Sequence, residues 1–327
     1  MDPNRYIYGD GGWRYNLAYE FLGHIGGVDT DRAGGFQEAS LKILENLGVN
    51  HEYIPYPCRN IYDALESIDT LIPRGRTAYI HTWNHLEREF LERHYRPYVE
   101  YPLINGKPDH TFLDLHFEYD GTYLISIPDR VTGEVYIDLL RKIVESILDK
   151  GGIAVLDLTH IPYSFREVGN IHKTLEPIWG NTFIYISFNE SLTTPGITTG
   201  CLYIPIELDD EIKIKPWDHR HIVDRTGGEL HVINAVWSSY LERVNNILEE
   251  RRRIASKKGF KIHGNRGYLE VRDVNAIHSL LTGLGILTLP VESLGRIYIS
   301  LTTDTSFKEA IEKVEDVLEE GAEGDNS

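Results

Sequence analysis

Apolar segments rich in β-branched and aromatic residues alternate along this chain with segments whose apolar residues recur at helical spacing. The alternation predicts an α/β fold around a mostly parallel sheet, because strands joined through a helix normally run in the same direction. The predicted strands are residues 77–81, 98–101, 122–127, 152–157 and 181–188. The predicted helices near them are residues 86–94, 136–148 and about 172–179.

The C-terminal part of the chain has a different order of elements. A long helical pattern covers residues 230–258 and is followed by a strand, a helix, a strand and a helix at residues 268–271, 274–284, 297–301 and 307–318. This order predicts a small α+β domain. We therefore expect an N-terminal segment (1–30) that packs with the small domain, a large domain (31–229) and a small C-terminal domain (230–327) with a frayed tail.

Composition excludes several classes of protein. A formal net charge of -17 argues against a nucleic-acid partner, because little positive charge is available to neutralise phosphates. The only cysteines, Cys58 and Cys201, exclude a disulfide framework and suit a reducing cytoplasm. No signal peptide or apolar run of membrane length is visible, so we expect a soluble, cytoplasmic protein with no membrane partner.

The segment from residue 186 to residue 200 reads I-S-F-N-E-S-L-T-T-P-G-I-T-T-G. It resembles the cofactor-lysine segment of the class I/II aminotransferases, which are fold-type I pyridoxal-phosphate enzymes. That segment reads S-x-x-K, then a flexible stretch, then G-x-R-x-G. Ser187, Gly196 and Gly200 match, whereas Glu190 stands at the lysine position and Thr198 at the arginine position. A carboxylate cannot form a Schiff base, so the resemblance predicts a protein without covalently bound pyridoxal phosphate.

Three further segments resemble the same family in the same order. Residues 71–83 are similar to its L-x-P-G-D and V-x-x-P-T-F/Y motifs, residues 126–133 to N-P-x-N-P-T-G, and residues 155–160 to V-x-D-E-x-Y. The resemblance spans about residues 40–318 and is greatest to the branch of histidinol-phosphate aminotransferase and threonine-phosphate decarboxylase. It implies a large domain with a mostly parallel seven-stranded sheet, a small α+β domain and a homodimer.

Two positions keep the residue type that the family uses around its cofactor. Asp157 stands where an aspartate pairs with the pyridine nitrogen, and Trp83 stands where an aromatic ring stacks on the cofactor. Each also has a purely structural interpretation: an aspartate that caps a loop, and a tryptophan in the core.

Other positions differ from the family. Arg130 replaces an asparagine that binds the cofactor oxygen, and His160 replaces the tyrosine that shares this task. The loop that contains Arg59 and Asn60 lacks the glycine and serine of the family's phosphate loop. Tyr298 replaces the arginine that binds substrate carboxylates. Arg296 lies two residues before it, where its side chain is expected on the same face of the strand.

These residues predict an acid–base site at the carboxyl ends of the strands. We expect Glu190, Asp157 and His160 to act catalytically on a small polar or cyclic metabolite, by isomerisation, cyclisation, elimination or hydrolysis. The predicted substrate-binding residues are Trp83, Arg130, Thr198, Ser187, Tyr298, Arg296, Arg59 and Asn60.

Three alternatives stay open at the level of sequence. One is a non-catalytic subunit that supports an active paralogue carrying the lysine, in a heterodimer. Another is a metal enzyme, with iron, manganese or zinc bound by Asp157, His160 and Glu190; the chain has 14 histidines, but only His81 and His85 have helical ligand spacing. The third is a transaminase of unconventional design that uses another lysine, such as Lys173.

Overall fold

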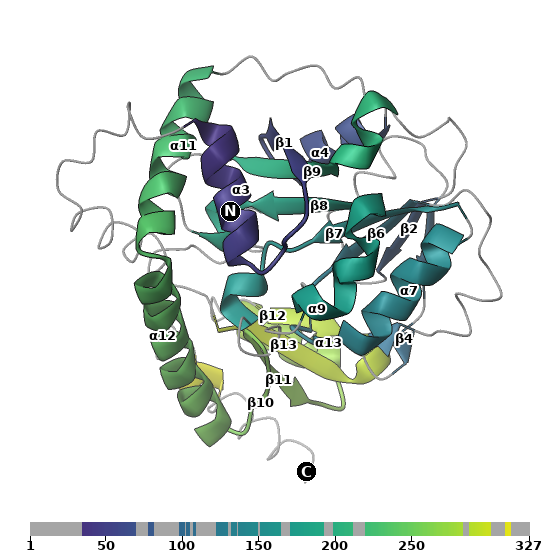
Figure 1. Cartoon of the computed structure of the whole chain (residues 1–327). Coiled ribbons are helices and arrows are strands. Elements are labelled where there is room, and N and C mark those ends of the chain that lie inside the picture. Colours follow the sequence, from purple (N-terminus) through teal and green to yellow (C-terminus); the bar gives the residue numbers. More distant parts are fainter. Residues whose placement is uncertain are drawn as a thin grey trace, which may run out of the picture.

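A seven-stranded sheet lies at the centre of the computed structural model, in the order β1-β9-β8-β7-β6-β2-β3 (Figure 1). The structure describes residues 35–69, 78–81, 98–101, 103–104, 107–108, 122–129, 132–135, 137–149, 151–164, 171–192, 199–211, 220–283, 288–301 and 311–314. The strands are β1 Tyr53–Cys58, β2 Ala78–His81, β3 Tyr98–Tyr101, β6 Thr122–Ser126, β7 Ile153–Asp157, β8 Thr182–Ser187 and β9 Gly200–Pro205. β9 is antiparallel to both its neighbours, and the other pairs are parallel. The predicted mostly parallel seven-stranded sheet is therefore confirmed.

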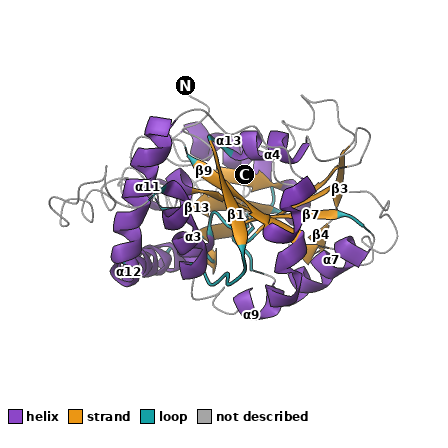
Figure 2. Cartoon of the chain, turned by 45° about the horizontal axis from the view of Figure 1, so that its top comes forward, coloured by secondary structure: helices purple, strands orange, loops and turns teal. Residues whose placement is uncertain are grey.

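Helices cover both faces of this sheet, as Figure 2 shows. The helix α4 lies on one face, while α3, α7 and α9 lie on the other. Their bounds are α3 Phe36–Asn46, α4 Ile61–Asp69, α7 Ile137–Asp149 and α9 Ile171–Leu175, which continues into the 3-10 helix η2 Glu176–Asn181. Because both faces are covered, the central strands are apolar at nearly every position. In β7, for example, Ala154 and Leu156 belong to one hydrophobic cluster and Val155 to the other.

A second sheet of four antiparallel strands, in the order β10-β11-β13-β12, forms the C-terminal lobe. It lies below the main sheet in Figure 1. Its strands are β10 Lys261–His263, β11 Arg266–Glu270, β12 Thr288–Val291 and β13 Arg296–Ser300, and the helix α13 is Val274–Gly283. Two short strands, β4 Leu103–Ile104 and β5 Lys107–Pro108, pair with each other separately.

The helix predicted over residues 230–258 is two helices, α11 Arg220–Ala235 and α12 Trp237–Lys257. Val236 interrupts them with a backbone outside the helical region (φ -116°, ψ 19°). The apolar periodicity continues across the break, so the sequence pattern alone did not reveal it. α11 contacts α3, whereas α12 contacts both β10 of the C-terminal lobe and the 3-10 helix η1 Ile161–Ser164 of the main lobe.

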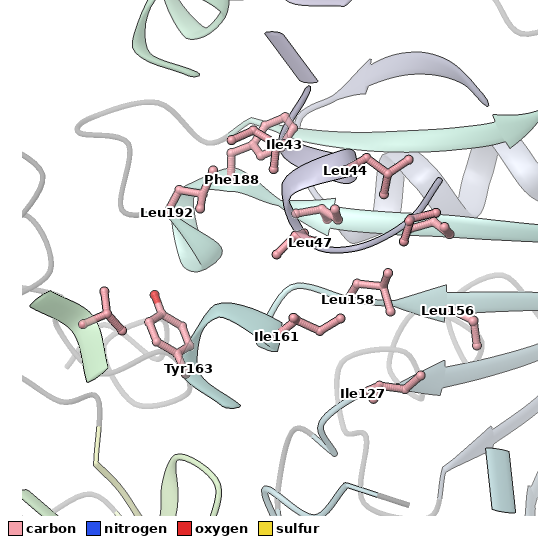
Figure 3. Packing of buried hydrophobic residues seen from close by; sticks show 14 of the residues in the cluster. Ile43, Leu44, Leu47, Ile127, Leu156, Leu158, Ile161, Tyr163, Phe188 and Leu192 are labelled. Atoms are coloured by element: carbon pink, nitrogen blue, oxygen red, sulfur yellow. The ribbon is translucent and has the colours of Figure 1, made fainter. Parts of the chain in front are cut away.

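Buried apolar side chains from α3 and from the segments after β7 and β8 form the core beside the main sheet (Figure 3). Phe188 begins the short helix α10 Phe188–Ser191 and Leu192 follows it, and both residues are fully buried. The Phe188 ring meets Phe36 of α3 edge to face, with centroids 6.1 Å apart. α10, which contains Glu190, is therefore anchored at both ends by the core.

Gly227 allows α11 to approach the start of α3 closely. A Cβ atom at Gly227 would lie 2.9 Å from the backbone nitrogen of Phe36 and 3.0 Å from its Cα. Alanine normally favours a helix over glycine by up to about 1 kcal/mol, but here the added methyl meets backbone. We expect Gly227→Ala to lower the free energy of unfolding by about 1–3 kcal/mol, measured by urea denaturation.

Gly283 of α13 is the matched control, because no described residue has an atom within 4 Å of a Cβ atom built there. Gly283→Ala is expected to leave stability unchanged or to raise it by about 0.5 kcal/mol. Equal effects of the two substitutions would show that the approach of α11 to α3 is not limited by this contact.

Candidate active site

The strands β1, β6, β7 and β8 have their carboxyl ends at the same edge of the main sheet. β6, β7 and β8 are parallel, and β1 shares their direction because β1 and β8 are both antiparallel to β9. Ser126 is opposite Asp157 in the sheet register, and Ser187 is opposite Gly200. Cys58, the last residue of β1, is also opposite Gly200. Open α/β sheets bind ligands at this edge, so the predicted residues at the ends of β1, β7 and β8 share one region.

Asp157 is held by hydrogen bonds where β7 ends. Its carboxylate accepts one from the backbone N–H of Thr159 at 3.0 Å and one from the Ser126 hydroxyl at 3.4 Å. The side chain is largely buried, with 6% of the residue exposed. Thr159 also accepts a hydrogen bond from the backbone N–H of Ser187 at 3.0 Å, so this threonine joins the ends of β7 and β8. Ser126 and Thr159 were not among the predicted site residues, although both lie in segments that resemble the family's motifs, 126–133 and 155–160.

His160 follows directly in the turn between β7 and η1. The residue is 8% exposed, and its ring centroid lies 6.0 Å from that of Tyr163. Its carbonyl oxygen accepts a hydrogen bond from the Tyr163 backbone N–H at 3.1 Å. The turn therefore fixes the backbone of His160 close to Asp157.

Glu190 lies in α10, the single helical turn that follows β8. The Leu192 N–H donates to the Phe188 carbonyl at 2.9 Å, and the Phe188 N–H donates to the Thr199 carbonyl at 3.0 Å. These bonds place the backbone of Glu190 at the carboxyl edge of the sheet. Its side chain, together with Trp83, Arg130 and Thr198, lies outside the described part of the structure.

Arg59 and Asn60 lie at the junction of β1 and α4, where their side chains have local partners. The Arg59 guanidinium forms two hydrogen bonds with the Asp63 carboxylate, at 2.7 and 2.8 Å. The Asn60 side chain accepts a hydrogen bond from the Asp63 backbone N–H at 3.1 Å. The first turn of α4 therefore carries a carboxylate and a capped N–H, an arrangement that opposes binding of a phosphate.

Tyr298 and Arg296 are on the same face of β13, as expected for residues two apart in a strand. Arg296 Nη1 lies 3.4 Å from the Tyr298 hydroxyl, and the guanidinium carbon lies 4.5 Å from the centre of the Tyr268 ring. Burial raises the pKa of Tyr298 to about 12, and the nearby charge of Glu134 acts in the same direction. Tyr298 is consequently a neutral phenol at physiological pH. Tyr268 and Glu134 were not among the predicted site residues.

Other candidate groups in the sequence have the following positions. Lys173 lies on α9 and is exposed. Cys58 and Cys201 are both buried, but they belong to clusters on opposite faces of the sheet. Among the described residues, no three His, Cys, Asp or Glu side chains lie close enough together to hold a metal ion. No helix in the described part is long and apolar enough to cross a bilayer.

The fold is that of the fold-type I pyridoxal-phosphate aminotransferases. The structure is similar to the aromatic aminotransferase from Pyrococcus horikoshii, with a TM-score of 0.68, 15% identity and coverage of 95% of this chain and 92% of that one. It is also similar to the histidinol-phosphate aminotransferase from Clostridium acetobutylicum, with a TM-score of 0.69, 13% identity and coverage of 95% of this chain and 98% of that one. The pyridoxal-phosphate-bound C–S lyase from Staphylococcus hominis is similar as well, with a TM-score of 0.67, 12% identity and coverage of 96% of this chain and 94% of that one.

No family model matches the sequence. No curated protein matches it either. At identities of 12–15%, the structural likeness establishes the fold and leaves the chemistry to be argued from the site.

Proposed function

We propose that this chain is an enzyme that works without covalently bound pyridoxal phosphate and uses Asp157, Glu190 and His160 for acid–base catalysis. The observation that carries the proposal is the arrangement around Asp157. A buried carboxylate is held by Thr159 and Ser126 at the ligand-binding edge of the sheet, beside the turn in which Glu190 stands at the lysine position. General acid–base catalysis needs such groups in fixed positions near the substrate.

The described residues fit pyridoxal phosphate only in part. Asp157 has the charge and the place to pair with a pyridine nitrogen, the interaction that makes the cofactor ring an electron sink. At the β1–α4 junction, however, the Asp63 carboxylate would oppose a phosphate, and it already binds the guanidinium of Arg59. Position 190 offers a carboxylate in place of an amine.

The remaining predicted residues suit a small polar or cyclic metabolite. Arg130 would hold an anionic group, and Trp83 would stack on a planar or cyclic part of the molecule. The neutral phenol of Tyr298 would offer a hydrogen bond where an arginine would hold a carboxylate. Isomerisation, cyclisation, elimination and hydrolysis all need only proton transfer and charge stabilisation from such a set.

A non-catalytic subunit is the second candidate. The carboxylate of Glu190 at the lysine position favours it, because a subunit that only supports an active paralogue needs no Schiff base of its own. Such a subunit would form a heterodimer with a homologue that carries the lysine. Obligate co-purification with that homologue, and inactivity without it, would support this candidate.

Absorbance after incubation with pyridoxal phosphate tests the proposal. We expect wild type and the matched Lys173→Ala variant to have the same absorbance spectrum, with no extra band in wild type that borohydride abolishes. The reason is that the site offers no amine at position 190. Peptide mapping after borohydride treatment identifies any lysine that reacts. A single lysine modified at one site per chain would show that the cofactor is bound covalently, and the proposal would then be abandoned.

A further inference from the structure

A tight turn follows β6 and connects it towards α7. The Asp129 carboxylate accepts hydrogen bonds from the Thr132 backbone N–H at 2.6 Å and from the Thr132 hydroxyl at 2.8 Å. The Gly133 N–H donates to the Asp129 carbonyl at 2.9 Å, and the Asp129 N–H donates to the Glu134 carbonyl at 3.0 Å. These bonds fix the position of Glu134 relative to the end of β6.

The same turn is connected to Asp157. The Ile127 backbone N–H, just before the turn, donates to the Asp157 carbonyl at 2.9 Å, and Ser126 donates to the Asp157 carboxylate. Through these two hydrogen bonds, a displacement of the turn would also shift the position of the Asp157 carboxylate.

The turn is in close contact with the β10–β11 hairpin of the C-terminal lobe. Gly133 has a positive φ of +70°, and a Cβ atom there would lie 2.5 Å from the His263 carbonyl oxygen and 2.8 Å from Arg266 Cγ. Next to this contact, Glu134 Oε1 lies 3.1 Å from His263 Nδ1. The two side chains are 13% and 31% exposed, respectively, so the pair is screened less than one at the open surface.

We propose that Glu134 and His263 form a proton-dependent latch that holds the C-terminal lobe against the turn beside Asp157. Both are positioning residues, because they act on Asp157 through the turn. An imidazole gains a positive charge in the range from about pH 8 down to about pH 5, and only the charged form attracts the Glu134 carboxylate strongly. Docking of the hairpin on the turn is thus stronger at acid pH and weaker at alkaline pH.

Charged and titratable groups surround His263 on three elements, and Glu134 is the carboxylate with a close approach to it among the described residues. On α12, which packs against β10, Arg252 donates to the Gly264 carbonyl and pairs with Glu249. Tyr268 of β11 lies 4.9 Å away, measured between ring centroids, and Arg266 is opposite His263 in the hairpin register. On the same strand as His263, Lys261 is bonded to Glu270, which Arg296 of β13 also approaches to 3.5 Å. Tyr298 of β13 is a phenol close to Glu134 and stays neutral at these pH values.

Amide hydrogen exchange of the peptide that spans residues 127–135 tests the latch in the full-length protein without any substrate. Protection is compared for wild type, His263→Asn, Glu134→Gln and the double variant, with intrinsic exchange rates corrected at each pH. At about pH 5.5 each single substitution is expected to lower protection about fivefold, and the double variant no further. At about pH 8.5 the effects should shrink to less than about twofold.

His278→Asn is the matched control. His278 is another partly buried histidine of the C-terminal lobe, and its Nδ1 lies 2.6 Å from the Thr288 hydroxyl, away from the turn. Its substitution should leave the protection of residues 127–135 unchanged at both pH values. Additive losses in the double variant at acid pH, or equal losses at both pH values, would overturn the latch. Because no substrate is needed, these outcomes are separate from failure of the proposed enzyme function.

Discussion

Asp157→Asn and Glu190→Gln are each expected to lower the turnover number by about 10²–10⁴-fold, the usual contribution of a general acid or base. Both substitutions preserve shape and remove the negative charge. In Asp157→Asn the amide oxygen can still accept the hydrogen bond from the Thr159 N–H, so the fold should be kept. Turnover is measured by mass spectrometry on small polar and cyclic metabolites, first as a screen with wild type and then with the purified variants.

Asp149→Asn is the matched control for these substitutions. Asp149 is the last residue of α7 and is exposed, so the same change of atoms takes place away from the site. Its turnover should equal that of wild type. Full activity in both Asp157→Asn and Glu190→Gln would remove the acid–base model, whereas loss of folding in Asp157→Asn would assign that carboxylate to structure alone.

Trp179→Ala is expected to lower the free energy of unfolding by about 3–5 kcal/mol. Trp179 lies in η2, is 0% exposed and belongs to the larger hydrophobic cluster. Its backbone carbonyl also accepts a hydrogen bond from the Tyr53 hydroxyl at 2.9 Å, which ties η2 to β1. Removal of the ring would leave a cavity that the sheet and η2 cannot close without moving. Urea denaturation followed by circular dichroism measures the change.

Trp179→Phe separates the role of the ring volume from that of the indole N–H. Among the described residues, the indole nitrogen has no hydrogen-bond partner, so its loss should carry no penalty from a broken bond. We expect Trp179→Phe to cost less than about half of the alanine substitution. Equal losses for both variants would indicate that the indole N–H has a partner that matters for stability.

The strand and helix pattern predicted much of the fold. The buried strands β6, β7 and β8, the helices α7 and α13, and the strand β13 lie within one or two residues of their predicted bounds. These elements carry strong periodicity or continuous apolar runs, which reflect burial directly. β1 and β9 were not predicted. β1 contains Pro55 and Pro57, which argue against a strand in sequence but are tolerated because β1 is an edge strand.

The candidate site was predictable as a set of positions but not as a set of contacts. Asp157 and Ser187 follow from motif resemblance, yet their connection through Thr159 depends on the register of neighbouring strands. Arg59 illustrates the opposite case: a candidate ligand residue in sequence, it forms a bidentate pair with Asp63 four residues later. Whether a charged side chain binds its neighbour or points to a ligand depends on helix geometry at the β1–α4 junction.

The sequence by itself determined the class of fold and the residue types at its functional positions, including the carboxylate of Glu190 at the lysine position. These properties are encoded locally, in the period of apolar residues and in the identity of single side chains. Only the tertiary structure decided that Glu134 of one lobe meets His263 of the other. The two residues are more than a hundred positions apart in the chain, and no local pattern specifies contacts that form when separate layers pack against each other.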